Sequence, residues 1–502
     1  MTFILKPGQL TLKDIEHLLD ESTTLTLDKS CTSAIHQSQK IIENILKEKK
    51  IIYGINTGFG ALAQKKIEPK QLEQLQTHLV LSHAAGTGPF LSDQAVRLIL
   101  LLKINSLARG FSGIRIDIIL ILIKLFNAKI YPLIPAQGSV GASGDLAPLA
   151  HLSALLLGVG KARYKNKIIS AKTALKIVGL HPIKFAPKEG LALLNGTQVS
   201  TALAILAYLA IENIFKTAMI AGALSIDAAC GSIQPFDERI HIVRGHPTQI
   251  EVAKRFRELL RGSHILKSHR NCQKVQDPYS LRCQPQVMGA CLAQMNYAKN
   301  ILITEANAVS DNPLIFAKDN EILSGGNFHA EPIAFAADTL AIAIAEIGAM
   351  SERRIAVLID PQFTQLPAFL VENPGMHSGF MLAQVTAAAL VSENKSLAHP
   401  ASVDSLPTSL NQEDHVSMAT YAARRLLSMA ENATTIVGIE LLAACQGIDF
   451  RRPLKTSNIL EKVHQVIRKH ISFYAHDRFF APDIENIKSL VQSKAISCRI
   501  ML

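Results

Sequence analysis

The sequence contains no tryptophan, and aromatic residues occupy only 5% of its 502 positions. Charged residues are also scarce, at 19%, whereas hydrophobic residues reach 48%. A chain of this composition has a mainly aliphatic core and buries a large fraction of its residues. The composition is typical of long, tightly packed helices, or of subunits that cover one another.

Long uninterrupted apolar runs are missing as well. A membrane span needs roughly 20 apolar residues, but Asp117 and Lys124 flank the isoleucine-rich segment and Asp227 breaks the run at 217–233. Residues 1–14 have a lysine inside a very short apolar run and no small-residue cleavage site, unlike a secretory signal. We therefore expect a soluble cytoplasmic protein that makes no membrane contact.

The seven cysteines include no CxxC pair. Their odd number indicates neither a disulfide framework nor a zinc site, and they suit a reducing cytoplasm. No cluster of ligand-type residues points to another metal. The net charge of +11 is compatible with nucleic-acid binding, but the basic residues are scattered. The densest patch, at 254–274, is typical of the solvated side of a helix and loop, so we expect neither a metal nor a nucleic-acid partner.

What the chain does contain is a series of apolar helical segments. One of them covers 330–359, with alanine, isoleucine and leucine on nearly every face, and at about 1.5 Å per residue it would be about 45 Å long. Further helices are expected at 378–398 and at 413–446, where Gly447 follows as a stop. Helices that are apolar all round cannot be half solvated, so they predict a bundle that other subunits complete.

The sequence therefore predicts a mainly α fold with two regions. Residues 1–215 form a smaller mixed region with a surface hairpin at 161–170, and residues 216–502 form the long-helix bundle. The periodicity of the segment at 114–127 does not separate helix from strand. No internal repeat, low-complexity tract or long linker marks the boundary, which is therefore approximate.

The loop at 138–151, GSVGASGDLAPLAH, contains residues that are able to react with one another. Small neighbours flank Ser143, so nothing bulky shields the Gly144 nitrogen or the Ala142 carbonyl carbon. Attack of that nitrogen on that carbonyl, with loss of water, closes a five-membered ring. Loss of the Ser143 hydroxyl then leaves an exocyclic methylene, an electrophile that no ordinary side chain offers. Asp145 is placed to handle protons.

A glycine-rich loop before an apolar helix is by itself more typical of a turn, or of a backbone cradle for an anion. The order of residues lacks the second-neighbour glycines of a hydrolase nucleophile elbow and the lysine of a phosphate-binding loop. The longer string ASGDLAPLAH resembles the signature of the aromatic amino acid ammonia-lyases. In that family an internal Ala-Ser-Gly forms the cofactor 4-methylidene-imidazol-5-one.

Further segments resemble the blocks of the histidine ammonia-lyase branch of this family, in its order and along essentially the full chain. They read YGINTGFG, LVLSHAAGTG, LLNGTQ, QDPYSLRCQPQVMGA, SGGNFHAEP and NQEDHVSMA. The resemblance implies an ammonia-lyase and fumarase-like helical fold, and a homotetramer with each site assembled from several subunits. It also implies a cofactor formed from Ala142-Ser143-Gly144, and the elimination of ammonia from L-histidine to trans-urocanate, the first step of histidine degradation.

The resemblance assigns roles to single residues. Tyr53 matches the catalytic base, which acts as a phenolate and needs neighbours that favour the anion. Tyr279 matches its companion near the cofactor ring and could share that role. Arg282 matches the residue that binds the substrate carboxylate through a bidentate guanidinium fork.

Two amides and one aromatic residue complete the implied pocket. Asn195 and Gln276 match the amides that hydrogen-bond the cofactor and the substrate. Without the resemblance, Asn195 is a turn residue before a helix. Phe328 matches the aromatic side chain that packs against the cofactor pocket, although a phenylalanine is otherwise a core residue.

Substrate choice is expected at His83 and Glu413. Burying the imidazole of a substrate without a hydrogen-bond partner costs about 1–3 kcal/mol. The carboxylate of Glu413 and the ring of His83 can supply such partners. We expect both a catalytic and a binding role for Glu413. It distinguishes a histidine-specific pocket more sharply than His83 does, since phenylalanine and tyrosine relatives usually carry a neutral residue there. His415 is expected to be structural. The alternatives are a tyrosine or phenylalanine ammonia-lyase or aminomutase, or a silent relative. The fumarase and aspartase signature GSSxMPxKxN is missing.

Overall fold

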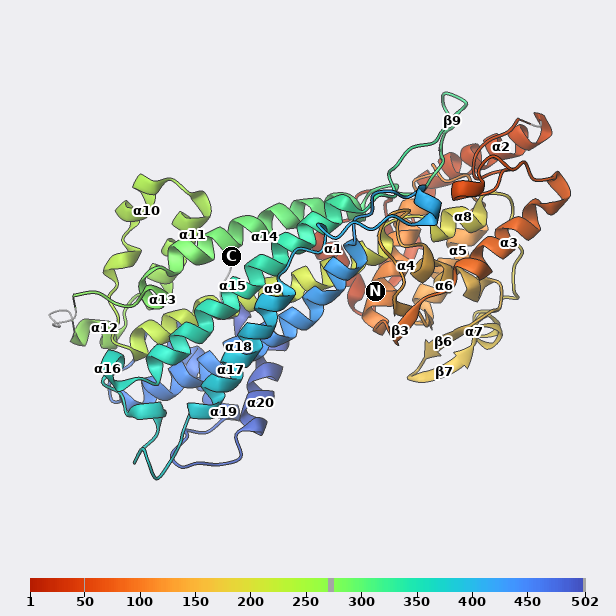
Figure 1. The fold of residues 1–502 in the computed structure, drawn as a ribbon. Helices are drawn as coiled ribbons and strands as arrows, with labels where there is room; N and C mark the ends of the chain where they lie inside the picture. The colour runs from red at the N-terminus through yellow and green to blue at the C-terminus, as the bar shows by residue number, and fades with distance from the viewer. Residues whose placement is uncertain (49, 270–274, 500–502) are drawn as a thin grey trace. The chain divides into compact units, whose positions relative to one another are not determined.

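The computed structural model describes residues 1–48, 50–269 and 275–499 and is mainly helical, as the sequence predicts (Figure 1). The chain forms two compact units, and each unit contains three stretches of the sequence. Unit 1 consists of Met1–Leu206, Lys299–Asp338 and Pro400–Arg424. Unit 2 consists of Ala207–Ala298, Thr339–His399 and Arg425–Leu502.

This division differs from the expected one at 215/216. The chain first leaves unit 1 at 206/207, close to that boundary, but it returns to unit 1 at 299–338 and 400–424. A linear reading of the sequence does not reveal such returns, because they depend on contacts between distant segments. Both returning stretches carry residues of the predicted site.

Unit 1 combines short helices with four small sheets. Its described elements are β1 Thr2–Leu5, α1 Leu12–Leu19, β2 Thr24–Leu27, α2 Thr32–Glu48, α3 Leu72–His83, β3 Thr87–Phe90, α4 Asp93–Leu107, α5 Ile116–Asn127, β4 Tyr131–Pro132, β5 Pro135–Gln137, α6 Leu146–Leu156, β6 Lys161–Tyr164, β7 Lys167–Ser170, α7 Ala171–Ile177, α8 Glu189–Leu194, β8 Leu314–Phe316 and β9 Glu321–Leu323. Strands β1 and β2 pair in parallel, whereas β3–β5, β4–β6–β7 and β8–β9 are antiparallel. The hairpin expected at 161–170 is confirmed as β6 and β7, with Lys161 opposite Ser170.

The core of unit 1 lies around α4, in which every residue from Ala95 to Leu107 is buried. The helix begins at Ser92, whose hydroxyl accepts a hydrogen bond from the Ala95 N–H at 3.2 Å. The buried Arg97 is satisfied entirely by backbone carbonyls, which include Leu18 O at 2.7 Å. Because these carbonyls come from several segments, one guanidinium fixes the helix against its surroundings.

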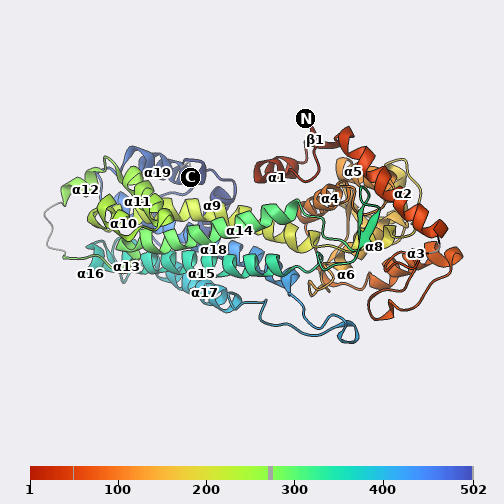
Figure 2. The same cartoon turned by 90° about the horizontal axis from the view of Figure 1, so that it is seen from above.

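Four long helices contribute residues to both units: α9 Gln198–Ala228, α14 Gln284–Ala306, α15 Glu331–Leu358 and α18 Ala419–Phe450. Their parts in unit 2 run alongside one another (Figure 1 and Figure 2). The other described α-helices of unit 2 are α10 Glu238–Arg244, α11 Pro247–Leu260, α12 His264–Ser268, α13 Tyr279–Arg282, α16 Pro361–Thr364, α17 Met381–Leu397, α19 Asn458–His470 and α20 Ala481–Gln492. The helices expected at 330–359 and 378–398 are confirmed as α15 and α17.

The helix expected at 413–446 is α18, and it differs from the expectation at both ends. It begins at Ala419, because the preceding segment at 408–418 forms a loop that reaches the candidate site. It also continues past Gly447 to Phe450. Gly447 permits a close contact within unit 2, since a Cβ atom there would lie 2.8 Å from the Ala228 Cβ. The expected helix stop is therefore a packing position.

Three of the described helices, α9, α15 and α18, are long and apolar enough to cross a membrane by length and composition alone. This corrects the expectation that charged residues interrupt every apolar run too early. In the structure, 78%, 72% and 89% of the residues in their most apolar stretches are buried within the protein. Asp227 in α9 is buried too and accepts a hydrogen bond from Ser263 Oγ at 2.9 Å, while burial raises its pKa to about 6. Packing therefore accounts for these apolar surfaces.

Candidate active site

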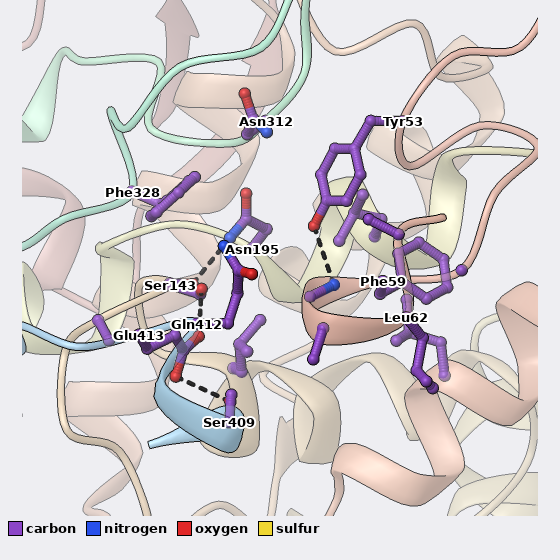
Figure 3. Close-up of a pocket in the computed structure, with 18 of the residues that line it drawn as sticks. Tyr53, Phe59, Leu62, Ser143, Asn195, Asn312, Phe328, Ser409, Gln412 and Glu413 are labelled. Carbon is purple, nitrogen blue, oxygen red and sulfur yellow. Dashed lines mark hydrogen bonds between the residues drawn. The ribbon is translucent and has the colours of Figure 1, made fainter. Parts of the chain in front are cut away.

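The Ala142-Ser143-Gly144 tripeptide lies in a bend directly before α6. Gly144 has a φ of +67° and pairs with Gly196, and a Cβ atom on Gly144 would lie 2.3 Å from the Gly196 oxygen. Only glycine fits this position. The close approach brings Ser143 beside Asn195, whose Nδ2 donates to the backbone carbonyl oxygen of Ser143 at 2.7 Å (Figure 3).

Asp145 anchors this bend to α9. One carboxylate oxygen accepts hydrogen bonds from the backbone N–H groups of Val199 and Ser200, at 3.0 and 2.8 Å, and from the Ser200 hydroxyl at 3.0 Å. The other oxygen accepts from Ser139 Oγ at 3.0 Å and from Thr420 Oγ1 at 2.5 Å. With five donors on a fully buried carboxylate, Asp145 fixes the position of the loop. The proton-handling role expected from the sequence stays a prediction.

Glu413 reaches the same bend from the loop before α18. Its Oε1 accepts a hydrogen bond from Ser143 Oγ at 2.5 Å, and its Oε2 accepts from Thr408 Oγ1 at 2.6 Å and from Ser409 Oγ at 3.1 Å (Figure 3). The turn at 409–411 is unusual, since all three residues have positive φ values between 52° and 62°. It is closed by Thr408 and Glu413, whose backbones bond to each other at 2.9 and 3.3 Å.

Tyr53 enters from a third segment and lies across the cavity from Ser143 and Glu413 (Figure 3). Its hydroxyl oxygen accepts a hydrogen bond from the Gly60 N–H at 3.3 Å, which fixes the position of that oxygen. Asn56 holds this loop in place: its side chain accepts from the Ile52 N–H at 2.9 Å and donates to the Lys50 oxygen at 2.7 Å.

These groups line one cavity of about 1110 Å³ in unit 1. Of the predicted site residues, the structure brings together Tyr53, His83, Ala142, Ser143, Asn195, Phe328 and Glu413 on its walls, and Gly144 lies directly behind Ser143. Sequence reasoning missed several polar lining residues outside the helices, among them Asn312 and Gln412.

His83 is half-buried at the end of α3, on the cavity wall. Burial lowers the pKa of its imidazole, although the Leu79 carbonyl and the charge of Glu413 act in the opposite direction. The ring is therefore mostly neutral at pH 7, and Ser82 Oγ lies 3.1 Å from its Nδ1. A neutral imidazole beside a carboxylate offers both a donor and an acceptor to a polar ligand.

Lys103 contacts the backbone of the site residue Asn195, and the sequence analysis did not identify it as part of the site. It is fully buried in α4, and its Nζ donates to the Asn195 oxygen at 2.8 Å and to the Ala192 oxygen at 3.1 Å. Burial lowers the pKa of this ammonium group to about 7. The sequence does contain a sign of this role, because Lys103 interrupts the apolar string LILLLKINSL. A charge inside a buried helix requires partners.

Besides Gly144, three predicted site residues are not among those that line the cavity: Gln276, Tyr279 and Arg282. They belong to unit 2, before and within α13. The Tyr279 side chain is 71% exposed, and the Arg282 guanidinium lies 4.5 Å from the centre of its ring. Arg282 Nε donates to the Asp277 oxygen at 3.0 Å.

The chain belongs to the aromatic amino acid lyases, a family that it matches over residues 10–469. It is 60% identical to a histidine ammonia-lyase of Vibrio cholerae, over 99% of this chain and 98% of that protein. Its structure is similar to that of histidine ammonia-lyase from Trypanosoma cruzi, with a TM-score of 0.92, 42% identity and coverage of 99% and 95%. It is also similar to the tyrosine aminomutase from Streptomyces globisporus, with a TM-score of 0.93, 34% identity and coverage of 98% and 97%. The resemblance stated from the sequence is confirmed.

Proposed function

We propose that this chain eliminates ammonia from L-histidine to give trans-urocanate, the first step of histidine degradation. In this reaction the carbon–nitrogen bond breaks and a proton leaves the neighbouring carbon. The observation that carries the proposal is the contact between Ser143 and Glu413 at 2.5 Å. This contact combines a serine of the cofactor-forming tripeptide with a carboxylate suited to an imidazole.

The residues around Ala142-Ser143-Gly144 fit the cofactor 4-methylidene-imidazol-5-one. Ring closure attacks the Ala142 carbonyl, so the Ser143 oxygen remains as a carbonyl, and the Asn195 Nδ2 already donates to it at 2.7 Å. When formed, this group supplies an electrophile that takes the substrate amine and makes it a better leaving group. The Asn195 N–H stabilises negative charge on the Ser143 oxygen. The Oδ1 of Asn195 is buried and has no hydrogen-bond partner among the described residues, so an acceptor is available to a substrate amine.

Tyr53 serves as the base that removes the proton from carbon. Its hydroxyl lies on the cavity side opposite Ser143 (Figure 3), and the Gly60 N–H donates to that oxygen and holds it in place. A substrate between Tyr53 and the bend at Ser143 has its carbon–hydrogen bond toward one group and its amine toward the other. Phe328 closes the cavity beside Asn195.

His83 and Glu413 select the imidazole side chain of the substrate. Glu413 accepts a hydrogen bond from an imidazole N–H, and the mostly neutral His83 provides a complementary partner. Phenylalanine offers no group that satisfies either residue. Placing an apolar ring here leaves both polar side chains without partners, which costs about 1–3 kcal/mol for each.

The remaining site residues come from other subunits of a cytoplasmic homotetramer. Gln276, Tyr279 and Arg282 lie in unit 2, and the exposed ring of Tyr279 is free to contact another chain. In the assembled enzyme Arg282 binds the substrate carboxylate through two parallel hydrogen bonds, while Tyr279 and Gln276 approach the reacting groups.

The test compares L-histidine, L-tyrosine and L-phenylalanine as substrates of the purified enzyme and of the Glu413→Gln variant. The enzyme is expected to convert histidine to urocanate and to leave the other two unchanged. Glu413→Gln is expected to lower kcat/KM for histidine by about 10- to 100-fold, since a hydrogen bond to a charged group contributes about 1.5–3 kcal/mol. The exposed Glu321→Gln serves as the control. A preference for tyrosine or phenylalanine, or β-amino acid products, would instead establish a lyase or aminomutase for those substrates.

A further inference from the structure

Beside the cavity, three side chains bring potential metal ligands together: His329, Glu331 and His415. Glu331 Oε2 lies 3.9 Å from His329 Nδ1 and 3.9 Å from His415 Nε2, and all three ligand atoms lie within 4.8 Å of one another. The first two residues precede or begin α15, and the third belongs to the loop before α18. All three are in unit 1.

The outer ring nitrogens of both histidines already have oxygen partners. His329 Nε2 lies 3.2 Å from the His415 carbonyl oxygen, to which it donates, so its Nδ1 carries the lone pair. His415 Nδ1 lies 3.3 Å from Ser405 Oγ, and the Val416 N–H holds that hydroxyl at 2.9 Å. Metal-binding histidines are oriented in this way by oxygen atoms behind them.

The two rings are stacked, with centroids 5.8 Å apart and planes 6° from parallel. Their inner nitrogens therefore flank the Glu331 carboxylate, whose Oε2 is buried and has no hydrogen-bond partner among the described residues. A buried carboxylate oxygen between two imidazole nitrogens is costly unless a cation or a proton compensates it.

We propose that His329, Glu331 and His415 bind a divalent transition-metal ion, of which Zn²⁺ is the best match. Two imidazoles and one carboxylate are the donor set of zinc sites that keep a fourth position open. At zinc–ligand distances of about 2.0–2.2 Å, tetrahedral ligand atoms are about 3.3–3.5 Å apart. The observed separations, 3.9 Å for the two histidine–glutamate pairs and within 4.8 Å for the whole set, are longer than this, so side-chain rotations must draw the ligands together when an ion binds.

The site lies next to the reaction cavity without using its catalytic groups. His329 and His415 line the cavity, so the open coordination position is accessible to water or a small anion from that side. His415 is only two positions beyond Glu413 in the sequence. A bound ion therefore ties the segment that carries Glu413 to the start of α15. Asp338 reinforces the same connection, since its carboxylate accepts from the Ala401 and Ser402 N–H groups at 3.0 and 2.9 Å.

Isothermal titration of the chelator-treated full-length enzyme with Zn²⁺ tests the proposal, and it does not depend on lyase activity. We expect one high-affinity Zn²⁺ per chain. His329→Gln, Glu331→Gln and His415→Gln should each weaken that binding at least about tenfold, because each removes one of three protein ligands. The exposed His36→Gln variant is the matched control and should bind as the parent does.

Co²⁺ gives a second measurement on the unmodified enzyme, which removes any dependence on how the variants fold. We expect the strong visible absorption of a four-coordinate Co²⁺ ion, displaced by one equivalent of Zn²⁺. The proposal is overturned if the parent takes up no stoichiometric Zn²⁺, if binding persists unchanged in all three variants, or if Co²⁺ gives only the weak spectrum of the hexaaqua ion.

Discussion

At the scale of single residues, the site depends on hydrogen bonds that converge on one serine. Asn195 donates to the Ser143 oxygen, and the Ser143 hydroxyl donates to Glu413. Behind them, Lys103 holds the Asn195 carbonyl at 2.8 Å. Because these groups belong to four separate segments, the position of the amide beside the serine depends on a buried lysine as well as on the loop itself.

Lys103 predicts a pH dependence of stability. Its pKa is about 7 in the folded protein, against 10.5 ordinarily, so between these values the unfolded chain binds the additional proton. The free energy of unfolding therefore rises with pH across this window and falls as pH drops toward 7. Lys103→Met removes this contribution. Thermal melts between about pH 7 and 10 should show that Tm of the parent rises relative to that of Lys103→Met. Parallel Tm profiles would contradict the assignment.

Much of the residue-scale site was predictable, and the reason is chemical. The glycine at 144 and the small residue at 142 are recognisable because ring closure needs both, and Tyr53, Asn195 and Glu413 stand in segments with clear motifs. Lys103 and the cluster of His329, Glu331 and His415 were not predicted, although HAE at 329–331 places a histidine two residues before a glutamate. Their partners come from distant parts of the chain, which spacing alone does not reveal.

At the scale of elements, the long helices of unit 2 are held together by a buried ion pair as well as by apolar packing. Arg354 on α15 bonds to Glu440 on α18 through Nε at 2.5 Å and Nη2 at 2.7 Å. Ser225 on α9 and Ser351 donate to the same carboxylate at 2.7 and 2.6 Å. Both charged side chains are completely buried, so the carboxylate fixes the register of three helices.

Glu440→Ala should destabilise the protein strongly. It leaves the Arg354 charge buried without its partner, and losing one member of a buried pair costs about 3–5 kcal/mol. Glu431→Ala lies on the same helix but removes only an exposed carboxylate 3.6 Å from Lys488, so a change below about 1 kcal/mol is expected. Chemical denaturation followed by circular dichroism measures both. Similar losses for the two variants would refute the role given to Glu440.

The elements themselves were predicted unevenly. The apolar periodicity located α15 and α17 to within a few residues, because packing on all sides leaves a strong pattern. The start of α18 was missed, since residues 413–418 bond to the loop at 139–141 instead of continuing the helix. Met418 N–H donates to the Val140 oxygen at 2.8 Å, and Ser417 Oγ donates to the Gly141 oxygen at 2.8 Å. A tertiary contact overrides local helix preference there.

At the scale of the whole molecule, the predicted site residues are divided between the two units. Unit 1 holds Tyr53, Ser143, Asn195 and Glu413, whereas Arg282 belongs to unit 2. The sequence predicts a bundle completed by other subunits, but the returns of the chain to unit 1 at 299–338 and 400–424 were beyond a linear reading. The proposed assembly from several chains would account for this divided site.

Subunit mixing tests this assembly. Tyr53→Phe and Arg282→Met should each be nearly inactive alone. When the two variants are dissociated and reassembled together at equal amounts, about one quarter of the sites combine an intact Tyr53 from one chain with an intact Arg282 from another. Activity should therefore return to about one quarter of that of the parent. If both residues acted within one chain, the mixture would remain as inactive as its components.

The central claim is that the Ala142-Ser143-Gly144 backbone becomes the electrophile of the reaction. Intact-protein mass spectrometry tests it most directly, on the active enzyme and on Ser143→Ala. The active enzyme should weigh less than its sequence mass by two water molecules, whereas Ser143→Ala should lack the methylene, retain its helical fold and lose ammonia-lyase activity. Full sequence mass in the active enzyme, or retained activity in Ser143→Ala, would contradict the claim.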